Sequence, residues 1–377
     1  MRLTLSAGQR ALREEFRAFA DTEVMPLAAR HDAEERIEPA LVGRLARAGY
    51  LGGLLPGQYG GRGLDHIAYG LLHEEIGRAC SATRSLLTVH DMVAHTVQRW
   101  GSLPQRERWL PRLADGRTVG AFALTEPEAG SDVTALSATA EPTADGYMLT
   151  GTKRWISFGT LAGLFLVFAR APEGLSAFLV ERGQAGLEIV PMPGPLGSRG
   201  AMLAELRFES CEIPRPNLLG GLGRAHPFVT TSTLTLGRYS VACGSIGVLQ
   251  GCVAASRRHA ADRGLIAHQL VQRLIAVMTA NAEAGRLLAL QAGELIGAGS
   301  PQAAMAATQA KYFATVAASD AARDAVQIHG AVGCAPDHPV ARYFRDAKVM
   351  EIIEGSTEVA ESAIGRFGHS RLVDGEY

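Results

Sequence analysis

The spacing of hydrophobic residues changes twice along this chain, and that change constrains the fold more than any other feature of the sequence. Between residues 7 and about 118, apolar side chains recur at helical spacing, as at Leu12, Phe16 and Phe19. From residue 121, short apolar runs such as LFLVFA alternate with Gly- and Pro-rich breaks, which is typical of strands. Helical spacing returns from about residue 228. This order predicts an α+β fold in which helices precede and follow a block of strands.

Three domains are expected, with limits at these changes. An N-terminal all-helical domain covers residues 1–120, a middle domain with a small β-sheet or barrel covers 121–227, and a C-terminal helical bundle covers 228–377. A chain of 377 residues is too long for one small core. Its 47% hydrophobic and 20% charged residues are typical of a globular protein.

The composition also restricts the class of partner. Lys and Arg number 37 against 38 for Asp and Glu, so no overall field attracts nucleic acid or an anionic membrane. The N-terminus lacks an apolar run followed by a cleavage site, and no stretch approaches about 18 consecutive apolar residues. Five scattered cysteines without a CxxC pair favour reduced, buried thiols and no metal. We therefore expect a cytoplasmic protein without nucleic-acid or membrane partners.

Two polar segments lie where strands should end. AFALTEPEAGSD (121–132) passes from a strand into a tight loop, and KRWISFG (153–159) places Trp155 and Ser157 near a strand end. Together they offer a flat apolar ring and several hydrogen-bond donors, which suit a planar heterocycle. The segment GYMLTGTK has the wrong residue order for a phosphate-binding loop. The sequence also lacks the nicotinamide and serine-hydrolase fingerprints.

A third segment, RDAKVMEIIEGSTEVAES (345–362), contains a carboxylate with two interpretations. Ser356 or Thr357 can cap the helix that follows, which leaves Glu354 in the preceding loop. A loop glutamate is usually solvated. The neighbouring Ile352 and Ile353 instead favour an apolar setting, where burial raises a carboxylate pKa toward the range of a general base.

These segments together resemble the acyl-CoA dehydrogenase family of flavoproteins. The resemblance covers nearly the whole chain and extends to LPGQYGGRGLD (55–65), TGTKRWIS (150–157), GSRGAMLAELRFESCEIPRPNLLG (197–220) and QIHGAVG (327–333). It implies an FAD-dependent enzyme that oxidises the CH–CH bond of an acyl thioester, on a fold with a helical, a β and a second helical domain.

The resemblance also assigns roles to individual residues. Glu354 would be the catalytic base, removing the α-proton while the β-hydrogen leaves as hydride to flavin N5. The residues that would bind FAD are Phe122, Leu124, Thr125, Gly130, Ser131, Trp155, Ser157, Arg263, His268, Gln269, Gln327, Ile328, Gly330, Ala331, Ser356 and Glu358. Those that would border the substrate are Ser131, Thr235, Arg238 and Gly355. Some relatives carry the base at the position of Gly237, which has no side chain, so Glu354 is the sole candidate.

Three features depart from the family pattern. Between Arg263 and His268 the chain is several residues shorter than in relatives, where this loop reaches the FAD of a neighbouring subunit. The shortening favours a homodimer over a tetramer. Glu358 stands where many relatives have Gln, and Ile353 stands where fatty-acid enzymes usually have an aromatic residue.

The segments SATRSLLTVHDMVAHTVQRWG (81–101) and GRYSVACGSIG (237–247) look more like the branch of the family associated with polyketide extender-unit biosynthesis. This resemblance implies a short polar acyl group, as in hydroxymalonyl or methoxymalonyl, carried on acyl carrier protein. Electron-transferring flavoprotein is the acceptor that the family implies. The alternatives are an ordinary short-chain acyl-CoA dehydrogenase, a flavin oxidase or monooxygenase on the same fold, and a non-catalytic member.

Overall fold

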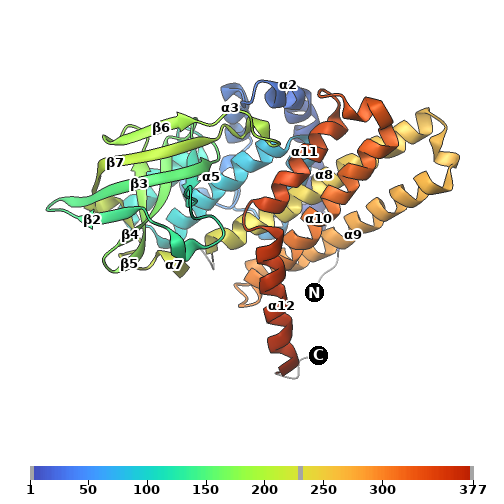
Figure 1. The fold of residues 1–377 in the computed structure, drawn as a ribbon. Coiled ribbons are helices and arrows are strands. Elements are labelled where there is room, and N and C mark those ends of the chain that lie inside the picture. Colours follow the sequence, from blue (N-terminus) through green and yellow to red (C-terminus); the bar gives the residue numbers. More distant parts are fainter. Residues whose placement is uncertain (1–3, 228–231, 374–377) are drawn as a thin grey trace.

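The computed structural model describes residues 4–227 and 232–373 and has the predicted order of helices, strands and helices (Figure 1). In Figure 1 the sheet forms one end of the molecule and the long helices of the bundle form the other, with α5 between them. The N-terminal helices are α1 (Ala7–Phe19), α2 (Ala28–Ala33), α3 (Pro39–Arg47), α4 (His66–Ala79), α5 (Ser81–Trp100) and α6 (Leu103–Ala114). The α+β prediction is therefore confirmed.

Local sequence explains where several of these helices begin. Ser6 and Gln9 form a capping box at the start of α1, and Ser102 and Gln105 form a second one at α6. The Asp65 side chain accepts a hydrogen bond from the Ala68 N–H at the start of α4. Each cap satisfies backbone N–H groups that have no partner inside the helix.

The middle domain is an open sheet rather than a closed barrel. Its strands are β1 (Gly120–Ala123), β2 (Thr139–Pro142), β3 (Gly146–Ile156), β4 (Leu164–Ala171), β5 (Gly174–Glu181), β6 (Leu187–Pro191), β7 (Ala204–Pro214) and β8 (Leu218–Leu219). They lie in the order β6-β7-β3-β2-β4-β5-β8, and β1 pairs in parallel with β4. β1 packs against α5 and also contacts β3, which brings the loops that follow β1 and β3 close together.

The C-terminal region consists of long helices, as the spacing predicts. They are α8 (Leu234–Asp262), α9 (Gln269–Gly297), α10 (Ala303–His329), α11 (Pro339–Ile352) and α12 (Thr357–Val373), after a short α7 (Ala225–Pro227). α8 runs through the centre and packs against α4, α5, α9 and α10. It crosses α4 closely at Gly244, where a Cβ added to Gly77 would lie 2.7 Å from the Gly244 Cα.

The structure bears on two predictions, namely that the chain has no membrane partner and that its thiols are buried. Among the described residues, α8 alone is long and apolar enough to cross a membrane, but 78% of its apolar window is buried inside the protein, as in a core helix. Four cysteines are buried, whereas Cys334 is exposed, so the prediction of uniformly buried thiols was wrong for that residue. Cys334 ends the short turn after α10, at the surface of the bundle.

Candidate functional site

A cavity of about 320 Å³ lies where the sheet, α5, α8 and the turn between α11 and α12 meet. It brings together side chains from segments that are more than 200 residues apart in the sequence. The predicted site residues that line it are Phe122, Leu124, Thr125, Gly130, Ser131, Trp155, Ser157, Arg238, Glu354, Gly355 and Ser356. The three polar segments found in the sequence therefore converge on one cavity.

Glu354 lies in the four-residue turn between α11 and α12, and it lines the cavity. Its Oε2 atom is inaccessible to solvent and has no hydrogen-bond partner within the protein. The carboxyl packs against α8 at Gly237, where an added Cβ would lie 2.4 Å from Oε2. The carboxyl thus occupies the space that a side chain at position 237 would take, and the solvated-loop interpretation of Glu354 is wrong.

Two cations hold this turn by its backbone. Arg238 Nε donates to the Glu354 carbonyl at 3.0 Å, and Lys311 Nζ donates to the carbonyls of Glu351 and Gly355 at 2.9 and 2.6 Å. Glu354 has a φ of 57°, which is uncommon for a residue with a side chain and persists only where surrounding contacts enforce it. Ser356 Oγ accepts from the Val359 N–H and caps α12.

Burial dominates the electrostatics of the site. It raises the pKa of Glu354 to about 7, although the charges of Arg238, Arg84 and Lys311 act in the opposite direction. Burial also lowers the pKa of Lys311 to about 8. A carboxyl group with a pKa near neutrality can take up and release a proton at physiological pH, which general acid–base chemistry requires.

A buried ion pair fixes the loop after β1 against β3. Lys153 Nζ lies 2.6 Å from Glu126 Oε1 and also donates to the Leu124 carbonyl at 3.1 Å. Glu126 in turn accepts hydrogen bonds from the N–H and Oγ of Ser137 and from the Ala138 N–H. Since both charged groups are buried and bonded, the loop that carries Thr125 and its neighbours is held at the cavity edge.

Trp155 has the properties of a surface for a flat ligand. Its side chain lines the cavity and is 56% exposed, and its backbone φ is 60°. The Arg154 guanidinium lies 5.4 Å from its ring centroid. Thr125 and Ser157 place hydroxyl groups near the same wall, and Phe122 and Leu124 add apolar surface. A flat ring with a polar rim matches this mixture of side chains.

The remaining predicted residues lie elsewhere in this chain. Arg263, His268 and Gln269 are exposed at the turn between α8 and α9. Thr235 is buried and lines a neighbouring hollow with His66 and His95. The others lie at the end of α10, in the turn that follows it, or in the exposed first turn of α12: Gln327, Ile328, Gly330, Ala331 and Glu358. Their proposed contacts with FAD stay predictions.

The cavity also contains residues that the sequence did not single out. Arg84, Ser85, Thr88 and Val89 contribute one wall from α5. The only sequence signal was a charged residue in the otherwise uncharged run SATRSLLTV. Since a helix can direct such a residue to solvent, its burial depends on how α5 packs against α8.

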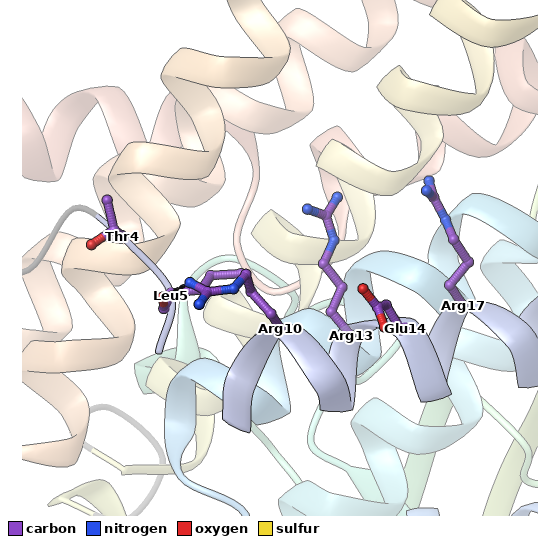
Figure 2. Close-up of a pocket in the computed structure, with 6 residues that line it drawn as sticks. All are labelled: Thr4, Leu5, Arg10, Arg13, Glu14 and Arg17. Atoms are coloured by element: carbon purple, nitrogen blue, oxygen red, sulfur yellow. Dashed lines mark hydrogen bonds between the residues drawn. The ribbon is translucent and has the colours of Figure 1, made fainter. Parts of the chain in front are cut away.

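A second hollow lies along α1 and is a weaker candidate (Figure 2). Figure 2 shows Arg13 and Arg17 extending from the same side of this helix. Arg13 pairs with the buried Glu74 and Glu75, and Arg17 pairs with Glu75. These arginines already have carboxylate partners, so we assign them a structural role.

Comparisons with known proteins decide the family of this chain. Sequence models of the acyl-CoA dehydrogenase N-terminal, middle and C-terminal domains match residues 6–117, 121–211 and 228–369. The mouse mitochondrial short-chain specific acyl-CoA dehydrogenase is 35% identical over 369 residues, covering 95% of this chain and 89% of that protein. The chain belongs to the acyl-CoA dehydrogenase family.

Two solved structures are also similar to this chain. FkbI, described as acting in biosynthesis of the methoxymalonyl extender unit of a polyketide, has a TM-score of 0.88 and 30% identity, covering 94% of this chain and 99% of its own. The prolyl acyl carrier protein oxidase AnaB has a TM-score of 0.89 and 25% identity, covering 97% and 99%. As a member of this family the chain is an FAD-dependent oxidoreductase that acts on CH–CH groups of acyl thioesters.

Proposed function

We propose that this enzyme dehydrogenates a short acyl thioester and that Glu354 removes the proton from the carbon next to the thioester. The observation that supports this role most directly is that Glu354 lines the cavity between sheet and bundle while its Oε2 atom has no hydrogen-bond partner in the protein. Its pKa of about 7 allows the carboxylate to accept a proton near neutral pH. Arg238 and Lys311 keep the turn in place through its carbonyls, so that the base is positioned before substrate binds.

The residues around Trp155 fit FAD. The Trp155, Phe122 and Leu124 side chains would cover the flavin ring, and the hydroxyls of Thr125 and Ser157 would bind its polar rim. When bound, FAD supplies the acceptor for the hydride that leaves the β-carbon. The protein's own contribution is to hold the base opposite this wall and to exclude water from the cavity.

The carrier that we propose for the acyl group is acyl carrier protein. The supporting observations are the resemblance of segments 81–101 and 237–247 to the polyketide extender-unit branch and the likeness to FkbI and AnaB. The likeness to short-chain specific acyl-CoA dehydrogenases supports CoA as the carrier instead. Binding titrations that monitor the flavin spectrum distinguish the two carriers. Each titration uses the same acyl group, attached either to acyl carrier protein or to CoA. Tighter binding of the CoA form would refute the preference for acyl carrier protein.

Analysis of the products tests the reaction itself. Single turnover of a saturated short acyl thioester should yield the α,β-unsaturated thioester, which is lighter by two hydrogen atoms. Incorporation of oxygen into the product would show a monooxygenase instead. Peroxide formed in step with the unsaturated product would show that oxygen is the acceptor, which is the oxidase alternative that the likeness to AnaB favours.

A further inference from the structure

The hollow that Thr235 lines, next to the cavity of Glu354, has a volume of about 290 Å³. It lies where the beginnings of α4, α8 and α10 meet the end of α5. His66 is the first residue of α4, and His95 and Arg99 lie in the last two turns of α5. We call it the basic hollow after these three side chains, none of which lines the cavity of Glu354.

The described lining of the basic hollow contains three basic side chains and no carboxylate. Its residues from α8 and from the turn between α9 and α10 are uncharged. The charged groups that act on the two histidines are Arg99 and, at the N-cap of α4, Asp65. The Asp65 carboxylate is already engaged by the Ala68 N–H at 2.7 Å. The hollow therefore concentrates basic groups and N–H donors.

The two imidazoles of the basic hollow are available to a ligand. Each is half-buried, and neither makes a hydrogen bond within the part of the chain that the structure describes. Burial lowers the pKa of His66, and burial together with the charges of His66 and Arg99 lowers the pKa of His95 to about 4. Both imidazoles are thus neutral at pH 7, with one N–H donor each, whereas the exposed Arg99 is cationic.

The start of α10 adds donors of its own. This helix is 27 residues long, and its N-cap residue, Gln302, makes no side-chain hydrogen bond to the first turn. Ala304 lines the hollow at this end of the helix, where backbone N–H groups lack partners inside the helix and the helix dipole is positive. Ser300 also lines the hollow, and because its Oγ accepts from the Gln302 N–H at 3.2 Å, its own proton points elsewhere. Such an arrangement favours an anion.

We propose that the basic hollow binds a phosphate group. A phosphate presents oxygens on every side, and the hollow offers donors from α4, α5 and α10 together with one permanent cation. A carboxylate presents two oxygens in one plane and would leave part of these donors unmatched. The charge of a bound phosphate favours the protonated imidazoles, so it raises the pKa of His66 and of His95. Inorganic phosphate and the phosphate groups of CoA share this chemistry, and the test separates the two sources.

Histidine NMR of the FAD-bound enzyme is the direct test. The protein is labelled with ¹³C in its histidine rings and titrated with inorganic phosphate at constant ionic strength, and His66→Gln and His95→Gln assign the two signals. Saturating phosphate should raise the pKa of both imidazoles by about one unit or more. The signal of His259, at the end of α8 and outside the hollow, should not respond. In calorimetry, Arg99→Met and His95→Gln should weaken phosphate binding by ~10-fold or more.

The matched control is Arg112→Met, which removes an exposed arginine of α6 that does not line the hollow and should leave phosphate binding unchanged. Histidine signals that ignore phosphate would overturn the inference, and so would equal phosphate affinity in Arg99→Met, because the ion would then bind elsewhere. Acetate bound as tightly as phosphate would overturn the assignment to phosphate. Displacement of inorganic phosphate by CoA would identify the acyl carrier as the source, and its persistence would identify free phosphate; either result supports the site. None of these readouts uses flavin chemistry, so failure of the role proposed for Glu354 would leave them unaffected.

Discussion

The raised pKa of Glu354 predicts a pH-dependent difference in stability between the wild type and Glu354→Gln. The carboxyl has an ordinary pKa of 4.5 in the unfolded chain and a pKa of about 7 in the folded one. At 1.36 kcal/mol for each pH unit, this difference is roughly 3 kcal/mol. Because the folded chain binds the proton more tightly, the contribution of Glu354 to the free energy of unfolding is fully present below pH 4.5. It is lost as the pH rises through about 7.

Glutamine cannot ionise, so the free energy of unfolding of Glu354→Gln does not fall in this way as the pH rises. Urea unfolding of the FAD-saturated proteins at several pH values between 5 and 8 should show the variant gaining about 2–3 kcal/mol on the wild type across that range. Glu358→Gln is the matched control, because Glu358 is exposed and the hydrogen bond from Ser356 lowers its pKa, so its titration lies below this range. Parallel stability curves for Glu354→Gln and the wild type would show that the carboxyl is not buried as described.

Further substitutions test the packing around the base and the loop. Gly237→Ala should keep FAD but slow flavin bleaching by at least ~100-fold, because the new methyl group displaces the Glu354 carboxyl; unchanged rapid-mixing kinetics would contradict the close contact. Lys311→Met should also slow bleaching by ~10-fold or more, since the carbonyl of Gly355 in the turn and that of Glu351 at the end of α11 each lose a hydrogen bond; an effect on thermal stability alone would contradict a positioning role. Lys153→Met should lower the free energy of unfolding by about 3–5 kcal/mol, and a second change, Glu126→Leu, should restore much of it. Equal effects of the single and double variants in urea titrations would argue against a buried pair.

Local signals in the sequence were sufficient to predict the order of helices and strands and the turn that carries Glu354. The two changes in hydrophobic spacing mark the sheet, and Gly355 and Ser356 are the residues expected where a turn precedes a capped helix. The resemblance to the family then placed Glu354 in this turn as the base. The structure adds that Glu354 lines the cavity and packs its carboxyl group against Gly237.

The sequence could not show what depends on non-local packing. Arg84 looked like an ordinary helical arginine, and only the approach of α8 at Gly244 buries its side chain. The sequence also could not predict how α8 is rotated about its own axis. A helix that is surrounded by protein has no polar face from which this rotation can be inferred. For this reason the sequence could not show that Arg238 lines the cavity of Glu354 whereas Thr235 lines a neighbouring hollow.

Anaerobic mixing of the FAD-bound enzyme with a reactive acyl thioester tests the role of Glu354 most directly. The wild type should bleach the flavin absorbance as the substrate is oxidised. Glu354→Gln should bind FAD and the thioester with similar affinity and bleach more slowly by several orders of magnitude, since its side chain cannot accept the α-proton. Bleaching by Glu354→Gln at the wild-type rate would show that another group removes this proton.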